Sequence, residues 1–344
     1  MTAPQPRANP RLLGHQAAEA TLAGAMSAGR LHHAWLITGP EGVGKATLAY
    51  RFARWLLAGM PAGEGLAVPL DAVFRRAAAG SHADLLTIER VFDAKNKRMK
   101  TQIAVEDARR VGPFLHLTAA EAGWRVVVID GAEDLNPSSA NALLKILEEP
   151  PARAVLLLVC ASPGRLLPTL RSRCRLLRLE ALSDAAMITL IAAYLPELNA
   201  GDRLRLAALS EGSPGRAMRL AGESGLACSA LVDEVLAALP DLRMTRAYTL
   251  ADTILRKDSS GESGFSTFMD VLRAALANAL RDTVRGMADA AQSRLIATHP
   301  IEAWPEMWHA LTKLQDETER FNLDKRQAIV AGLGMLSQTG SGLP

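Results

Sequence analysis

The chain has 344 residues, 39 of them basic and 36 acidic, and the formal net charge of +3 is too small to indicate a nucleic-acid-binding surface by itself. With 49% hydrophobic and 4% aromatic residues it can bury a large core, and its length predicts two or three domains. Cys160, Cys174 and Cys228 are widely spaced and form no C-x-x-C pair, which argues against a disulfide framework and against zinc. We find no signal peptide or membrane-spanning run, and we expect a soluble, cytoplasmic protein.

The N-terminal part of the chain predicts a strand between two helices. Residues 1–10 are polar and proline-rich, and we expect them to be disordered. Apolar side chains recur at helical spacing over residues 13–29. Residues 34–38 form a short apolar run that ends in a Gly-Pro pair, so they predict a buried strand, and residues 46–58 predict the next helix.

The central part predicts further strands separated by helices. Residues 59–82 are rich in Gly, Ala and Pro and indicate irregular structure, whereas residues 84–89 indicate a second strand. A helix over residues 105–111 is interrupted by the Gly-Pro pair at 112–113. Residues 126–129 are all apolar, as expected of a strand in a parallel sheet that is covered on both faces.

The following elements complete an alternating order. Asn136 predicts an N-cap with Pro137 at the first helical position, and residues 154–160 and 176–179 indicate the last two strands. Strands that alternate with helices predict a doubly wound α/β fold, with a parallel sheet and helices on both faces.

The domain organisation follows from where the strands end. We predict an α/β P-loop domain over residues 11–180, preceded by the disordered N-terminus. Beyond it we predict a small helical lid domain over 181–223, an all-α collar domain over 224–337 and a tail over 338–344.

The most specific motif is G-x-x-x-x-G-K from Gly39 to Lys45, between a predicted strand and a predicted helix. Its glycines, among them Gly39, Gly42 and Gly44, let backbone N–H groups surround phosphate oxygens, while Lys45 reaches the terminal phosphates. The alternative is a tight strand-to-helix turn without a ligand.

The position after the motif lysine departs from this pattern. Ser or Thr is needed there to ligate Mg²⁺, but Ala46 has no hydroxyl. Thr47 follows, about 100° further around the helix. We therefore expect weak binding of ATP or ADP, poor coordination of Mg²⁺ and negligible turnover.

A second candidate is Asp130, which ends the apolar run 126–129 and resembles a Walker B carboxylate. Active hydrolases of this type place Glu next, where this chain has Gly131. Glu133 lies two residues further on a predicted turn, and we do not expect it to substitute. The alternative role of Asp130 is to cap a turn at the end of a strand.

Three further candidates depend on their context. Ser162 follows a predicted strand, where a polar side chain can sense a terminal phosphate, although a turn hydroxyl is the simpler interpretation. Arg173 lies in a basic segment that would be a solvated surface without other evidence. Arg216 starts a helix after a Gly/Pro turn and could reach back to a nucleotide.

Three segments together resemble the bacterial clamp-loader subunits of the AAA+ superfamily. They are residues 14–34, the run NALLKILEEPP at 141–151 and the run LPTLRSRC at 167–174. The resemblance covers residues 13–223 well and the remainder more loosely.

The resemblance implies a clamp-loader subunit of the DNA polymerase III holoenzyme, which loads the sliding clamp onto primed DNA during DNA replication. Arg173 would be an arginine finger that completes the ATP site of an adjacent motor subunit, and Arg216 would match a second sensor. The partners would be the gamma/tau motor and delta subunits in a five-subunit ring, at replication forks on the nucleoid.

Ala46 and Gly131 then favour a stator that hydrolyses little or no ATP, without catalysis of its own, while the nucleotidyltransferase reaction belongs to the larger assembly. Two alternatives remain: an active clamp-loader motor ATPase and a stand-alone AAA+ remodeller. A homo-oligomer with its own ATPase would favour either alternative.

Overall fold

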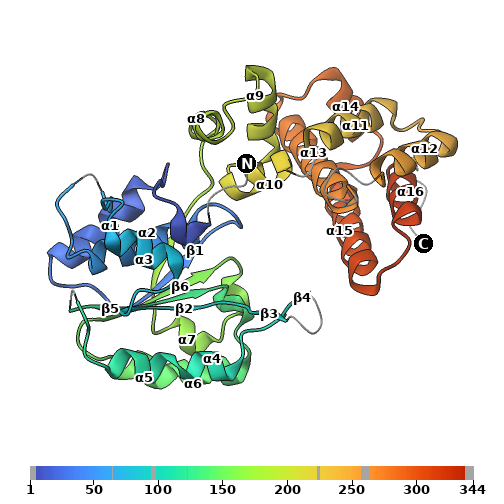
Figure 1. Ribbon diagram of the computed structural model, residues 1–344. Helices are drawn as coiled ribbons and strands as arrows, with labels where there is room; N and C mark the ends of the chain where they lie inside the picture. The colour runs from blue at the N-terminus through green and yellow to red at the C-terminus, as the bar shows by residue number, and fades with distance from the viewer. Residues whose placement is uncertain are drawn as a thin grey trace. The chain divides into compact units, whose positions relative to one another are not determined.

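The computed structural model describes residues 5–63, 65–93, 98–121, 123–222, 225–256 and 264–337 (Figure 1). Its contacts divide the chain into two units. The α/β unit comprises the residues up to Tyr194 together with Glu211–Arg216, and the helical unit comprises Leu195–Ser210 and the residues from Ala217 onward. The boundaries predicted at residues 180 and 223 stay predictions, and the predicted tail, 338–344, lies outside the described residues.

A five-stranded parallel sheet forms the centre of the α/β unit, in the order β2-β5-β6-β1-β7. The predicted fold class is therefore confirmed. The strands are β1 (Ala34–Thr38), β2 (Leu85–Ile88), β5 (Arg125–Asp130), β6 (Ala154–Cys160) and β7 (Arg175–Arg178). A separate antiparallel pair joins β3 (Phe92–Asp93) to β4 (Arg98–Met99).

The five strands of the sheet form at or close to the residues predicted for them. Every residue of β1 and β6 is buried, because both faces of the sheet are covered. In the parallel register Thr38 pairs with Cys160 and Trp35 pairs with Arg175. All five strands therefore end at one edge, the carboxyl edge, and begin at the opposite, amino edge.

Helices cover the two faces of the sheet (Figure 1). Asn136 caps α6 (Pro137–Glu148) as predicted, accepting a hydrogen bond of 2.8 Å from the Ser139 backbone N–H. On one face lie α1 (Gln16–Ser27), α2 (Lys45–Leu57) and α3 (Ala72–Ala79). On the other lie α4 (Val105–Arg109), α5 (Val111–His116), α6 (Pro137–Glu148) and α7 (Pro168–Arg171). The unit also includes α8 (Asp184–Tyr194) and the short helices η1 (Pro6–Ala8), η2 (Ala132–Asp134) and η3 (Pro163–Arg165).

Two expectations about the helices were wrong. The segment 59–82 is not irregular throughout, because α3 forms within it, capped by Asp71 and ended by Gly80 in the left-handed conformation. The Gly-Pro pair at 112–113 does not interrupt the helix for long, since α5 begins at Val111 and includes it. Proline is tolerated there because first-turn N–H groups have no partner within a helix.

The expected disorder of residues 1–10 is also wrong for the part that is described. The side chain of Arg54, on α2, is 1% exposed and donates hydrogen bonds of 2.6 Å to the Arg7 carbonyl and 2.7 Å to the Asn9 carbonyl. The Asn9 side chain accepts a hydrogen bond of 3.1 Å from the Tyr194 hydroxyl. These bonds order residues 5–9 against the α/β unit, while residues 1–4 lie outside the described chain.

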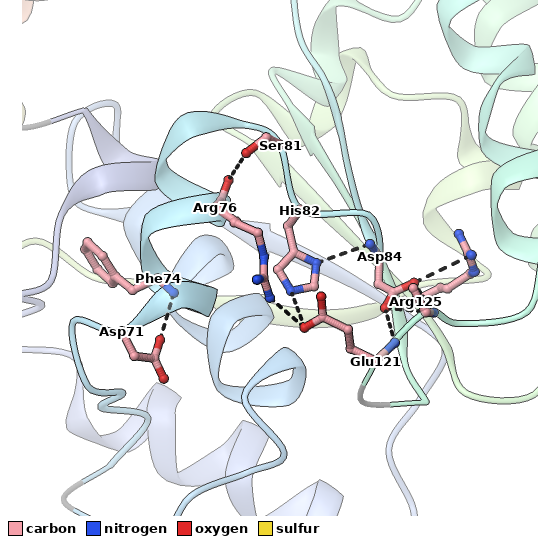
Figure 2. A network of polar contacts seen from close by, with 9 residues as sticks. Asp71, Phe74, Arg76, Ser81, His82, Asp84, Glu121 and Arg125 are labelled. Atoms are coloured by element: carbon pink, nitrogen blue, oxygen red, sulfur yellow. Dashed lines mark hydrogen bonds and ion pairs between the residues drawn. The ribbon is translucent and has the colours of Figure 1, made fainter.

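A buried polar network joins β2 and β5 at the amino edge (Figure 2). Fully buried Asp84 accepts backbone hydrogen bonds from Ala120 (2.8 Å) and Glu121 (3.0 Å), and its carboxylate lies 3.5 Å from the Arg125 guanidinium. Glu121 in turn pairs with Arg76 of α3 at 2.6 Å. The network therefore connects the loop before β5 to both β2 and α3.

Among the described residues, the chain beyond β7 contains helices and loops but no strand, as predicted. The long helix α13 (Phe265–Arg285) buries Phe265, Phe268 and Met269 in the helical unit. Trp304 is buried and donates a hydrogen bond of 3.2 Å to the Ile296 carbonyl. Besides α13 the helices of the second half are α9 (Ala200–Leu209), α10 (Pro214–Gly222), α11 (Gly225–Ala238), α12 (Met244–Ile254), α14 (Ala290–Ile296), η4 (Ile301–Ala303), α15 (Trp304–Phe321) and α16 (Lys325–Ser337).

Candidate nucleotide site

The predicted phosphate loop lies where β1 meets α2, at the carboxyl edge of the sheet. Gly44 is the N-cap of α2 and has a φ of +113°, a conformation that favours glycine because it has no Cβ. The loop therefore presents the start of a helix, where free backbone N–H groups favour an anion. This geometry fits a nucleotide phosphate.

Lys45 is held by the loop itself. Its ammonium donates hydrogen bonds of 2.9 Å to the Gly39 carbonyl and 2.6 Å to the Pro40 carbonyl, and the residue is only 6% exposed. Burial lowers the pKa of Lys45, while the nearby carboxylates, Glu133 foremost, act in the opposite direction. Two of the three N–H donors of this ammonium therefore already have acceptors in the loop.

A turn from the predicted lid packs directly on the phosphate loop. The Ser213 hydroxyl donates a hydrogen bond of 2.8 Å to the Glu41 carbonyl, and the Gly215 N–H donates one of 2.8 Å to the Gly42 carbonyl. A Cβ on Gly42, whose φ is +70°, would lie 2.6 Å from the Ser213 hydroxyl oxygen. Gly42 and Gly215 are therefore both needed for this close approach, because neither has a Cβ.

Arg216 follows this turn and is the candidate second sensor. Its guanidinium pairs with Glu211 at 2.7 Å, and its backbone N–H donates a hydrogen bond of 3.2 Å to the Ser213 hydroxyl. The turn therefore brings Arg216 to the neighbourhood of the phosphate loop, but in this structure its side chain contacts a carboxylate of its own segment.

Asp130 ends β5 at the same edge as the phosphate loop. Burial raises the pKa of its carboxyl to about 6, with smaller contributions in the same direction from Glu89 and Glu133. Lys45 and Arg90 lower it, though by less. Lys45 and Asp130 therefore each affect the pKa of the other at this edge of the sheet, and their Walker A and Walker B roles stay predictions.

The raised pKa of Asp130 predicts a pH-dependent stability. Because the folded state holds this proton more tightly than the unfolded state, the contribution of Asp130 to stability is lost as the pH rises from about 4 to about 6. Asp130→Asn should therefore stabilise the chain by roughly 2–3 kcal/mol at pH 8 and by little at pH 4. Urea denaturation of both proteins at the two pH values measures this, and an equal effect at both would contradict it.

The residues predicted to coordinate Mg²⁺ or to sense a terminal phosphate are less suited to these roles than the phosphate loop is to binding phosphate. Ala46 provides no ligand atom, Thr47 is buried in α2, and the exposed Ser162 makes no side-chain capping bond at η3. Within the described residues, no group of three or more His, Cys, Asp or Glu side chains is arranged to hold a metal ion. The phosphate loop therefore fits a nucleotide better than the surrounding residues fit its Mg²⁺.

Arg173 lies away from this site, at the opposite edge of the sheet. It precedes β7, which pairs with β1 so that Arg175 is beside Trp35 at the start of β1, whereas the phosphate loop follows the end of β1. Its guanidinium donates hydrogen bonds of 2.7 Å to Glu148 and 2.9 Å to the Thr169 carbonyl, and the side chain is 36% exposed. The length of a strand therefore separates Arg173 from the phosphate loop of its own chain.

Several contacts of these residues were missed from the sequence. The Ser213 and Gly215 bonds to the phosphate loop and the Glu148 partner of Arg173 join segments far apart in the chain. Glu148 is part of the run at 141–151 that carries the family resemblance. That run does not indicate that Glu148 pairs with Arg173. Glu133 was considered only as a substitute base, but its Oε1 accepts a hydrogen bond of 2.9 Å from the Ala161 N–H.

The fold and the site define the class. The strand before the phosphate loop, β1, is separated by β6 from β5, which ends in Asp130, and a helical segment packs on the loop, so the unit is a parallel α/β domain of the P-loop type. Residues 14–183 match the family model described as DNA polymerase III, delta subunit. The match therefore covers just under half of the chain.

The curated relatives include delta-prime and tau subunits of DNA polymerase III. The DNA polymerase III subunit delta-prime of Pseudomonas aeruginosa is 39% identical over 191 residues, covering 56% of each chain. That of Escherichia coli is 36% identical over 201 residues, covering 58% of this chain and 57% of the relative. The Escherichia coli subunit tau is 33% identical over 174 residues, covering 50% of this chain and 25% of the relative.

The matches leave part of each protein uncompared. The chain spans little more than half the length of the two delta-prime relatives, 56% and 57%.

None of the helices in the described parts of the chain combines the length and the apolar character that a membrane span needs.

Proposed function

We propose that this chain is the delta-prime, or stator, subunit of the DNA polymerase III clamp loader, which helps to load the sliding clamp onto primed DNA. In this role it donates Arg173 to the ATP site of an adjacent gamma/tau motor subunit and hydrolyses little or no ATP itself. The family match over residues 14–183 and the delta-prime relatives support the assignment.

The position of Arg173 is the observation that carries the donated arginine. An arginine finger stabilises charge on a phosphoryl group during transfer, so it must reach the terminal phosphate. Arg173 is partly exposed at the amino edge of the sheet, whereas the chain's own phosphate loop is at the carboxyl edge. Its geometry therefore suits a nucleotide on a neighbouring subunit rather than its own.

The second candidate function is an active motor, and the phosphate loop favours it. Gly39, Gly44 and Lys45 are all present, and the Escherichia coli subunit tau is 33% identical to the chain over 174 residues. Against a motor, Ala46 lacks the metal-binding hydroxyl and Gly131 replaces the usual glutamate. We propose weak ATP or ADP binding without effective hydrolysis.

Lys45→Ala distinguishes the two functions. In a stator, Lys45 takes no part in turnover and already binds the Gly39 and Pro40 carbonyls, so clamp loading should change by less than about twofold. The measurement is loading of a labelled clamp onto primed DNA by a reconstituted complex containing the delta and gamma/tau subunits. Normal assembly with a collapse of loading would show that the nucleotide site of this chain is needed.

A further inference from the structure

Glu133 is half-buried and has one buried carboxylate oxygen that the proposed function does not explain. It lies on η2, between the Walker B strand β5 and helix α6. Its Oε1 accepts the hydrogen bond from the Ala161 N–H, while its Oε2 is buried and, among the described residues, accepts no hydrogen bond. Burying a carboxylate oxygen without a donor is costly, so the arrangement calls for a physical account.

The carboxylate lies beside the phosphate loop. Ala161 directly follows β6, and β6 pairs with β1 so that Cys160 is beside Thr38. Ala161 is therefore next to Gly39 across the two strands, which are about 4.8 Å apart in a sheet. The Gly39 carbonyl binds the Lys45 ammonium, so Glu133 and Lys45 are held at the same ends of the same two strands.

The electrostatics agree with this placement. Among the charges that act on Lys45, Glu133 has the largest effect on its pKa, although burial outweighs it. Burial is the main cause of the raised pKa of Asp130, and Glu133 adds to it after Glu89. Burial likewise raises the pKa of Cys160 to about 12, assisted by the charge of Glu133 and by a hydrogen bond between the two side chains. A single carboxylate thus acts on the Walker A lysine, the Walker B aspartate and the end of β6.

We propose that Glu133 is a built-in competing anion that lowers the affinity of the phosphate loop for nucleoside triphosphates. A bound phosphate would have to compete with the Gly39 and Pro40 carbonyls for the Lys45 ammonium, and it would lie close to a fixed negative charge in a poorly solvated site. Repulsion between like charges is strong in such surroundings. The proposal deepens the proposed function, on which it rests in assuming that the loop is a weak nucleotide site.

A simpler role for Glu133 is to join the ends of β5 and β6 through Ala161, and the test must separate the two. Glu133→Gln keeps an acceptor for the Ala161 N–H but removes the charge. Asp134→Asn is the matched control, because Asp134 is the next residue and its carboxylate pairs instead with Arg90 at 3.1 Å. Glu133→Ala is a second variant in case the glutamine is not tolerated.

The experiment is titration of each full-length variant with a fluorescent ATP analogue, after circular dichroism has shown the native fold. We expect Glu133→Gln to bind at least about tenfold more tightly than the natural chain. Asp134→Asn should stay within about twofold, and adding Lys45→Ala to Glu133→Gln should remove the gain. If neither Glu133 variant binds more tightly, or if Asp134→Asn gains as much, the proposal is wrong.

The proposed function is read out separately, by the effect of Arg173→Ala on ATPase in a complex with natural Glu133. If Arg173→Ala left the ATPase of this complex unchanged, the donated arginine would be overturned and the Glu133 result would still stand. Tight binding of the analogue by the natural chain would overturn the proposal for Glu133 and leave the donated arginine standing.

Discussion

Replacing Arg173 by alanine is expected to lower ATP turnover at the adjacent motor site by about 10³-fold or more, the size of effect known for arginine fingers. Such a change corresponds to about 4 kcal/mol of transition-state stabilisation. The isolated subunit should keep its fold, because the ion pair with Glu148 is exposed and contributes little to stability. Steady-state ATPase of the reconstituted complex should therefore lose the share contributed by the site next to this chain.

Arg171→Ala is the matched control for this prediction. Arg171 is an exposed arginine of the same segment, two residues earlier at the end of α7. Its replacement removes the same charge but should leave turnover of the complex nearly unchanged. Equal losses from both variants would indicate a general electrostatic effect, and an unchanged ATPase for Arg173→Ala in a fully assembled complex would remove the assignment of the finger.

Replacing Asp84 by alanine should cause the largest loss of stability, about 3–5 kcal/mol. The change leaves the buried Arg125 without its carboxylate partner and deprives the Ala120 and Glu121 N–H groups of their acceptor. Because these groups join β2 to the loop before β5, the loss should appear in the α/β unit (Figure 2). Hydrogen exchange of the β5 amides measures the free energy of opening there.

Asp71→Ala provides the comparison for this loss. Asp71 caps α3 near the same network, accepting a hydrogen bond of 3.1 Å from the Phe74 N–H at the protein surface. Removing a helix cap should cost only about 1 kcal/mol. If Asp84→Ala costs no more than Asp71→Ala, the buried network does not stabilise the sheet as we describe.

The strands were predictable because their signals are local. Runs such as Val126–Ile129 and Ala154–Cys160 are apolar throughout, and a covered parallel sheet is the ordinary structure for them. Helix α3 was missed although Asp71 and Gly80 are ordinary cap residues, because the Gly/Ala/Pro-rich surroundings hid an eight-residue helix. The error came from weighing average composition above cap signals.

Order in residues 5–9 could not be predicted from their own sequence. It depends on Arg54, more than 40 residues away, whose buried guanidinium donates hydrogen bonds to the Arg7 and Asn9 carbonyls. The contact between the Ser213 hydroxyl and the phosphate loop spans an even longer separation of 172 residues. Such contacts are consequences of the tertiary fold and leave no periodic trace in the chain.

In the candidate site, too, the features encoded in one short segment were predictable, whereas those that depend on contacts between distant segments were not. The spacing from Gly39 to Lys45 indicates a phosphate loop because all of its groups lie in one short segment. The opposite placement of Arg173 required the register of β7 beside β1, which the sequence does not contain in readable form. Likewise the turn predicted at Glu133 was correct in position, but its bond to Ala161 depends on the neighbouring strand.

The weak nucleotide site and the donated arginine form one account. Lys45 bound to its own loop, Ala46 without a hydroxyl and Glu133 beside the loop all disfavour nucleotide turnover in this chain. In the proposed function, this chain contributes to hydrolysis only through Arg173, which it would present to a neighbour. The account therefore requires activity in the complex and its absence in the isolated chain.

Steady-state ATPase of the purified chain, alone and with the delta and gamma/tau subunits, the clamp and primed DNA, tests this claim most directly. We predict no turnover by the chain alone, and stimulation of the complex that requires Arg173. Robust turnover by the chain alone, abolished by Lys45→Ala, would contradict the account and identify the chain as a motor.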